Sequence, residues 1–341
     1  MMRLLSLLVL LAAPPVQAAL EPGIALSLAA SILQVEAPRA LGGVALGSGV
    51  AVAPGQVVTN CHVTRDAAEI RVVHRGTRLR VAGQASDLDH DLCLLQVPGL
   101  QAPPAQFGRA DELHVGQALM ALSFTGGMAM QNSAGEVVAL HRLDGGHVVQ
   151  SSNWFTSGAS GGGLFDDQGR LVGILTFRLR GGAAHYFAAP AEWVQAMLAA
   201  AALDGYPPVR PLGALPLSYW QKTEAAQPRF LRAAVLQRDD HWGELARLAR
   251  DWLREDDQDA EPWYLLGVAL DRLDRLPEAR QALECSLGIE PERRSAWQMH
   301  GPLYDRLGQA DAAERVRERL VADAGTLPNL PTAETCVAEA R

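Results

Sequence analysis

The amino-acid sequence predicts two structured parts, an all-β domain followed by an all-α domain of helical repeats. Up to about residue 190, short runs rich in Val and Leu are separated by Gly, Pro, Asp or Asn, as strands are separated by turns. Many short strands without intervening helices indicate barrels or a sandwich. Beyond about residue 226 the hydrophobic period becomes that of helices, and sequence features recur at a fixed spacing.

Strand-length runs define the β-domain. They cover residues 49–52, 69–73, 92–95, 137–140 and 171–175. Residues 190–202 then indicate one helix that closes this domain.

The repeat in the second half is carried by aromatic, small and turn-forming residues. Trp263, Leu266, Gly267 and Leu270 recur as Trp297, His300, Gly301 and Tyr304, and Ala279 recurs as Ala313. This displacement equals the period of tetratricopeptide repeats, in which Pro291 would end the second helix of a pair. Residues 230–252 resemble a degenerate earlier copy; a plain helical bundle is the alternative. Stacked helix pairs present a concave groove, so we expect a protein or peptide partner there.

Composition shifts set the expected domain boundaries. We expect the β-domain over residues 19–205, a Pro-rich linker over 206–226, repeats over 227–326 and a loose tail over 327–341. The linker contains Pro207, Pro208, Pro211 and Pro216, which predict a semi-rigid spacer.

The segment 1–18 has the layout of a secretory signal peptide. Residues 1–3 supply a short positive segment, residues 4–13 are apolar, and Pro14 and Pro15 end that run. Small residues near Ala18 predict cleavage after it. The apolar run is too short to span a bilayer. We therefore expect a periplasmic or secreted protein without stable membrane insertion.

Charge and cysteine content narrow the function classes. The formal net charge of −8 disfavours binding to nucleic acid and to anionic membranes. No Cys-x-x-Cys or His-x-x-x-His spacing indicates a metal site, and we expect no cofactor. Four cysteines in an oxidising compartment allow three disulfide connectivities, between which the sequence does not choose.

A Gly-rich loop around Ser160 predicts a nucleophile. A catalytic serine needs a tight turn that exposes its hydroxyl, with neighbouring backbone N–H groups aimed at the developing oxyanion. Gly158 has no Cβ, so it can adopt the dihedral angles that aim its N–H there. Gly161 and Gly162 keep the wall after the nucleophile thin.

Two further residues complete an arrangement for nucleophilic catalysis. His62 follows a predicted strand, and Asp91 opens another strand farther along the chain. His62 could take the hydroxyl proton of Ser160, and Asp91 could orient the imidazole. A lone His or Asp at these places is usually structural, but the three signals arrive together in the order His, Asp, Ser.

These motifs resemble the trypsin-like serine proteases, and more closely their HtrA/DegP branch. The matching segments are residues 47–49, 59–63, 91–95, 158–162 and 186–190. The resemblance covers about residues 27–200 and implies a double six-stranded β-barrel with the triad His62, Asp91 and Ser160 between the barrels. It also implies an oxyanion hole made by the N–H groups of Gly158 and Ser160, and protein or peptide substrates.

The nucleophile loop departs from that branch. Ser157 and Ala159 stand where the branch commonly has Pro and Asn, and helical repeats stand where a PDZ domain would follow. Trp154, six residues before the nucleophile, would form an apolar floor of the specificity pocket if it points inward; it could equally be a core residue.

Cys61 and Cys93 flank the proposed base and its orienting acid. If His62 and Asp91 touch, these two thiols could pair, because Cys93 shares a strand face with Asp91. The alternative is two buried free thiols.

Two other functions fit parts of the sequence. The loop matches Gly-x-Ser-x-Gly, the nucleophile elbow of α/β-hydrolases, but a turn and a strand rather than a helix follow Ser160. The chain could also be a catalytically weak or inactive protease-fold scaffold that binds proteins through its repeats.

Overall fold

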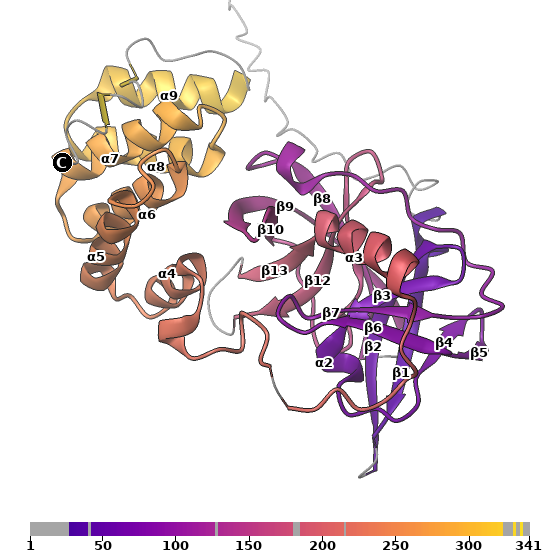
Figure 1. The fold of residues 1–341 in the computed structure, drawn as a ribbon. Coiled ribbons are helices and arrows are strands. Elements are labelled where there is room, and N and C mark those ends of the chain that lie inside the picture. Colours follow the sequence, from indigo (N-terminus) through magenta and orange to yellow (C-terminus); the bar gives the residue numbers. More distant parts are fainter. Residues whose placement is uncertain are drawn as a thin grey trace, which may run out of the picture.

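The computed structural model describes residues 27–39, 42–126, 129–179, 185–214, 216–322, 330–331 and 335–336. The expected signal peptide, residues 1–18, lies outside these ranges. Figure 1 shows a β-domain followed by a separate group of helices. None of the described helices combines the length and the hydropathy that a membrane span requires.

The first half of the β-domain is a seven-stranded antiparallel sheet. Its order is β5-β4-β1-β2-β3-β7-β6. The strands are β1 (Ile32–Pro38), β2 (Val44–Ala53), β3 (Gln56–Asn60), β4 (Arg71–His74), β5 (Thr77–Arg80), β6 (Gly83–Asp87) and β7 (Leu92–Gln96), with the short helix α2 (Cys61–Thr64) after β3.

This sheet corrects the expectation of two closed six-stranded barrels. Its edge strands β5 and β6 pair with β4 and β7 respectively, and not with each other. Only Val81 and Ala82 separate them in the chain. The N–H of Val81 donates to Ile70 at one edge and the N–H of Ala82 donates to Gln96 at the other. The bend at Val81 and Ala82 thus connects the two edge strands without pairing them. The sheet therefore stays open as a half-barrel.

The second half is a closed barrel of six strands in the order β10-β13-β12-β11-β8-β9. These are β8 (Ala118–Thr125), β9 (Ala129–Leu143), β10 (Gly146–Ser151), β11 (Gly163–Asp166), β12 (Leu171–Arg178) and β13 (Tyr186–Pro190). The 3-10 helix η1 (Ala110–Glu112) precedes them, and the closing helix expected near residues 190–202 is α3 (Ala191–Asp204).

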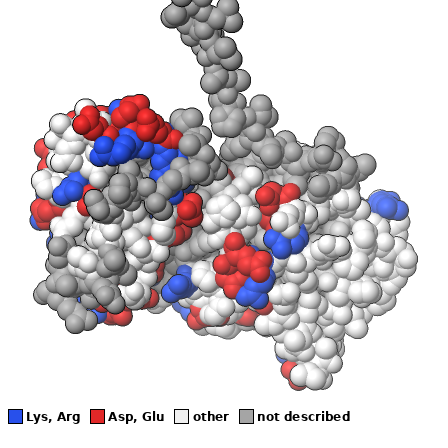
Figure 2. Space-filling view, turned by 90° about the horizontal axis from the view of Figure 1, so that it is seen from above, with Lys and Arg blue, Asp and Glu red and all other residues white. Residues whose placement is uncertain are grey.

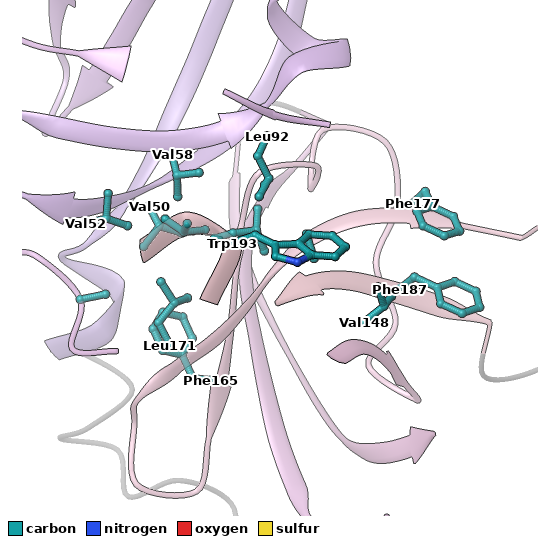
Figure 3. Close-up of a cluster of buried hydrophobic side chains, with 14 of the residues drawn as sticks. Val50, Val52, Val58, Leu92, Val148, Phe165, Leu171, Phe177, Phe187 and Trp193 are labelled. Carbon is teal, nitrogen blue, oxygen red and sulfur yellow. The ribbon is translucent and has the colours of Figure 1, made fainter. Parts of the chain in front are cut away.

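Alternation along the strands of the first sheet sorts their side chains into two hydrophobic clusters. In β7, Leu92 and Leu94 belong to the cluster shared with the barrel, whereas Leu95 belongs to the interior of the half-barrel. Neighbouring residues in β3 divide in the same way, because successive side chains of a strand point to opposite faces. The shared cluster joins Val50, Val58 and Leu92 to Phe165, Leu171 and Phe187 of the barrel (Figure 3).

Several described residues of the expected semi-rigid linker contact the first half of the β-domain. The carbonyl of Pro207 accepts from Gln84, and Pro208 forms an isolated bridge with Gly83. Farther along, the N–H of Leu212 donates to Arg65 at 2.8 Å. The guanidinium of Arg65 in turn donates to the carbonyls of Gly213 and Ala214.

The helical domain begins after the short 3-10 helix η2 (Glu224–Ala226). Its helices are α4 (Arg229–Arg238), α5 (Trp242–Leu253), α6 (Ala260–Arg272), α7 (Leu276–Ile289), α8 (Arg294–Arg306) and α9 (Ala310–Ala322). Helices α5, α7 and α9 begin at residues 242, 276 and 310, which are evenly spaced. Helices α6 and α8 begin at residues 260 and 294 with the same interval.

Equivalent contacts recur with these helices. The indole N–H of Trp263 donates to the carbonyl of Asp257, and that of Trp297 donates to the carbonyl of Pro291. A Cβ on Gly267 would lie 2.7 Å from Leu283, so this glycine lets α6 and α7 approach closely. The periodicity read from the sequence is therefore structural; its identification as tetratricopeptide repeats stays a prediction.

The two domains share part of one hydrophobic core. Phe230 and Leu231 of α4 belong to the cluster that contains Val148 and Phe187 of the barrel. The imidazole of His141 in β9 stacks on Phe230 with ring centroids 4.3 Å apart. Helix α4 is thus packed onto the barrel.

The cysteines pair as Cys61–Cys93 and Cys285–Cys336. The second disulfide fixes part of the expected loose tail to α7. A Cβ on Gly288 of that helix would meet the carbonyl oxygen of Pro331 at 2.1 Å, so the tail lies directly against it.

We predict that His300 makes the helical domain acid-sensitive. Burial in α8, with a smaller effect from Arg280, lowers the pKa of His300 from 6.5 to about 4. The contribution of His300 to the stability of the folded state is therefore complete above pH 6.5 and is lost as the pH falls toward 4. The reason is that the unfolded chain binds a proton at this imidazole more readily than the folded chain does. Between pH 7 and pH 5 the free energy of unfolding should fall by about 2 kcal/mol.

Urea unfolding at the two pH values measures this loss, and His300→Gln should largely abolish it. His241→Gln, at an exposed position of the same domain, is the matched control. An equal loss in wild type and His300→Gln would contradict the assignment.

Candidate active site

A buried carboxylate holds an imidazole at the end of the first sheet. Asp91 is 0% exposed, and its Oδ2 lies 2.5 Å from Nδ1 of His62. Its Oδ1 accepts a 2.8 Å hydrogen bond from the backbone N–H of His62. The imidazole side chain is 26% exposed. One carboxylate therefore fixes both the ring and the backbone of His62, and leaves the ring accessible.

The local backbone places Asp91 for this task. It has a φ of 60°, a conformation that Asp tolerates better than most residues, immediately before β7 begins. Its carbonyl accepts from the N–H of Cys61 and the side-chain amide of Asn60, both at 3.0 Å. The Cys61–Cys93 disulfide ties α2 to β7 beside the pair. Three kinds of bond therefore hold these two segments together.

Ser160 lies in the connection between β10 and β11 of the barrel. Ser48 of β2 is 0% exposed and forms hydrogen bonds with this loop. Its N–H donates to the carbonyl of Ser160 and its hydroxyl donates to the carbonyl of Gly158, each at 2.8 Å. The same hydroxyl accepts from the N–H of Phe124. Ser48 thereby connects the sheet that carries His62 to the barrel that carries Ser160.

Two peptide units of the loop have fixed orientations. The carbonyl of Ser157 accepts from Gly126 at 2.8 Å, and the carbonyl of Ala159 accepts from Gly162 at 2.9 Å. In a trans peptide the following N–H points the opposite way, so the N–H groups of Gly158 and Ser160 point away from these partners. Within the described part of the chain, neither N–H donates a hydrogen bond.

Two glycines make this loop geometry possible. Gly158 has a φ of 92° and Gly161 a φ of 88°. A Cβ on Gly161 would lie 2.1 Å from the carbonyl oxygen of Ser48, so no other residue fits there without displacing β2.

The Ser160 hydroxyl donates to the carbonyl of Thr176 at 3.4 Å, which is a weak contact. Among the described side chains, no hydrogen bond joins Ser160 to His62. Thr176 nevertheless links the two halves, because its own hydroxyl accepts from the amide of Asn60 at 3.2 Å. The structure thus joins His62 to Asp91 directly, and it connects Ser160 to that pair only indirectly, through Thr176 and Asn60. The triad of all three residues stays a prediction.

Trp154 is 53% exposed, so its interpretation as a core residue is wrong. It lies in the loop that leads from β10 to Ser160. Its role as an apolar floor of the specificity pocket stays a prediction.

Trp220 is a site residue that sequence reasoning missed. Its indole Nε1 donates to Oδ2 of Asp91 at 3.3 Å, and its ring meets the ring of His62 edge-on at 5.7 Å. It lies in the segment between the two domains, where no motif marks it. Only its being a Trp in a Pro-rich stretch could have drawn attention to it.

In the described ranges, one group of side chains could gather around a metal ion, namely Asp89, His90 and Asp144. Asp89 already pairs with Lys222, and both ring nitrogens of His90 contact carboxylates, those of Asp87 and Asp144. These groups therefore satisfy one another, and they lie outside the His62–Asp91 pair.

Comparison with known proteins identifies the β-domain. Residues 47–174 match the family model of the trypsin-like peptidase domain. The chain is 36% identical over 136 residues to a probable periplasmic serine endoprotease DegP-like of Ectopseudomonas mendocina, covering 38% of this chain and 28% of that protein. It is 30% identical over 137 residues to the corresponding protein of Chlamydia pneumoniae, with the same coverage. The chain thus spans less than a third of the length of these relatives.

Solved structures agree on the fold. The Rv3671c protease of M. tuberculosis in its active form is similar with a TM-score of 0.52 and 22% identity, over 59% of this chain and 91% of that one. A serine endoprotease from Yersinia pestis is similar with a TM-score of 0.50 and 24% identity, over 56% and 69%. Residues 47–174 of this chain therefore match the trypsin-like peptidase domain, and this part of the chain is similar to the DegP-like serine endoproteases.

Proposed function

We propose that this protein is a serine endopeptidase that hydrolyses peptide bonds of exported or misfolded proteins through an acyl-enzyme intermediate. The observation that carries the proposal is the buried Asp91 carboxylate 2.5 Å from Nδ1 of His62. A carboxylate removed from water and directed at a partly exposed imidazole has little value for a binding scaffold. It is what a general base needs for orientation. The pair therefore favours the enzyme over the inactive scaffold.

The proposed roles follow from the protonation of the imidazole. With Asp91 accepting the proton on Nδ1, the neutral ring of His62 carries a free lone pair on Nε2. That nitrogen would take the proton of Ser160 as its oxygen attacks the substrate carbonyl, and would later return it to the leaving amine. For this step the hydroxyl of Ser160 would leave its weak contact with Thr176 and turn toward that nitrogen.

The oxyanion would be stabilised by the backbone. The N–H groups of Gly158 and Ser160 are oriented by the carbonyls on the other side of the same peptide planes and are not otherwise used among the described residues. Donors held in place in this way do not have to reorganise as negative charge develops. Ser48 contributes by fixing the carbonyls of Gly158 and Ser160.

We place the protein in the periplasm or outside the cell. The matched relatives are described as periplasmic, residues 1–18 have the pattern of a signal peptide, and two disulfides join the four cysteines.

For the helical domain we propose a tetratricopeptide-like function in holding protein substrates or partners. A cavity of about 740 Å³ lies between β9–β10 and helices α5, α6 and α8. Trp242, Tyr264 and Met299 line it together with acidic and basic side chains. Figure 2 shows acidic and basic side chains interspersed on the helical part, whereas the visible face of the β-domain carries fewer charges. An extended segment with apolar and mixed-charge residues would suit such a site.

We predict that a fluorophosphonate probe labels Ser160 of the folded full-length chain. The reaction needs the hydroxyl to be activated by His62, so heat-unfolded protein should not react. Intact-mass measurement and peptide mapping locate the adduct, and Ser160→Ala should abolish it. Folded wild-type protein that stays unlabelled would favour the scaffold.

We predict that Ser48→Ala slows this labelling about 10-fold, with little change in fold. The substitution leaves the carbonyl of Gly158 and the N–H of Phe124 without their shared partner in a part-buried place, where the cost for each group is at most about 1–3 kcal/mol. Part of that cost should appear as a less ordered oxyanion loop. Ser123→Ala, at a buried serine of the adjoining strand β8, is the control. Equal rates in wild type and Ser48→Ala would show that Ser48 does not order the loop.

A further inference from the structure

The segment that leads from the β-domain into the helices turns back onto the acid of the proposed triad. The N–H of Tyr219 donates to the carbonyl of Asp89 at 2.9 Å, and Nζ of Lys222 lies 2.5 Å from the carboxylate of Asp89. The side-chain amide of Gln227 donates to the carbonyls of Trp220 and Lys222. This return segment, residues 218–222, is thus anchored two residues before Asp91.

Trp220 is held firmly within the return segment. Its ring stacks on Phe177 with an interplanar angle of 7° and a centroid distance of 4.9 Å, and Phe177 stacks in turn on Phe187 at 4.7 Å. Phe187 and Phe230 of α4 also contact each other. A continuous aromatic column therefore runs from the first helix of the repeat domain through the barrel to Trp220.

The indole and the imidazole share one acceptor. Oδ2 of Asp91 accepts from Nδ1 of His62 and from Nε1 of Trp220, while Oδ1 accepts from the backbone of His62. A fully buried carboxylate requires several donors to remain charged without large cost. In the described structure, Trp220 supplies the one side-chain donor to the carboxylate of Asp91 that does not come from His62.

We propose that Trp220 is a positioning residue for the His62–Asp91 pair, so that the segment joining the two domains completes the active site. This inference rests on the proposed endopeptidase function. The return segment would then do more than connect the two domains. Through the aromatic column, the helical domain would influence how the carboxylate of Asp91 is held and how much negative charge it directs at the imidazole.

Loss of the Trp220 donor should change the pH profile of the activity, because it changes the charge that Asp91 presents to His62. Among the described residues, the titratable groups near Asp91 include Asp89, which is paired with Lys222, and the phenol of Tyr219. Burial, aided by Asp91 and Asp89, raises the pKa of Tyr219 well above 10, so this phenol stays neutral. Removing the indole N–H would leave more negative charge on Asp91 for His62, which favours the protonated ring. The neutral base would then form only at higher pH.

The test is Trp220→Phe in the full chain, which keeps an aromatic ring on Phe177 and loses the N–H donor. We expect kcat/KM on an unfolded protein substrate to fall about 10-fold, mainly through kcat. The acid limb of the pH profile should move to higher pH. Trp193→Phe is the matched control, because its indole donates to the carbonyl of Asp144 away from the pair.

Each outcome decides the proposal. A lower rate with a shifted acid limb in Trp220→Phe, and an unshifted limb in Trp193→Phe, supports it. An unchanged rate, or a uniform fall at all pH values that matches a lower Tm, overturns it and leaves Trp220 a packing residue. Labelling of Ser160 by the fluorophosphonate in wild type separates these results from a failure of the endopeptidase proposal itself.

Discussion

The buried carboxylate of Asp91 is the constraint around which the site is built. A charge with no exposed surface must be compensated by hydrogen-bond donors, and its donors here come from α2 and from the segment between the domains. The positive φ of Asp91, the hydrogen bonds of its carbonyl and the adjacent disulfide all serve the same position. His62 is oriented because it is one of the groups that satisfies this carboxylate.

The loop that carries Ser160 also depends on contacts between the two halves of the β-domain. Ser48 lies in the half-barrel sheet yet holds the carbonyls of the loop that carries Ser160. The hydrophobic cluster shared by the two halves holds these elements against each other (Figure 3). The helical domain joins the arrangement through α4, whose Phe230 packs into that cluster and lies at the end of the aromatic column that supports Trp220. The sequence pattern therefore divides the chain into two domains, but one hydrophobic cluster includes residues of both.

Patterns of local chemistry made much of this predictable. The order of strands and then helices follows from hydrophobic period, and the recurrence of Trp263 as Trp297 predicts helices that repeat at that same interval. The pairing of His62 with Asp91 was open to prediction because each opens or follows a strand within a familiar motif. The open half-barrel and the packed course of residues 206–226 were not, because both depend on long-range backbone hydrogen bonds that carry no local signal. Trp220 was missed for the same reason, and the exposure of Trp154 shows that residue type alone does not decide burial.

The tautomer of His62 tests the central claim most directly. Nitrogen NMR of histidine-labelled full-length protein, with the resonance assigned through His62→Gln, reports which ring nitrogen carries the proton. A neutral ring protonated at Nδ1, with that proton far downfield and lost in Asp91→Asn, is the predicted result. A neutral ring protonated at Nε2, or a ring that exchanges freely between the two tautomers, would show that Asp91 does not hold the imidazole as a base.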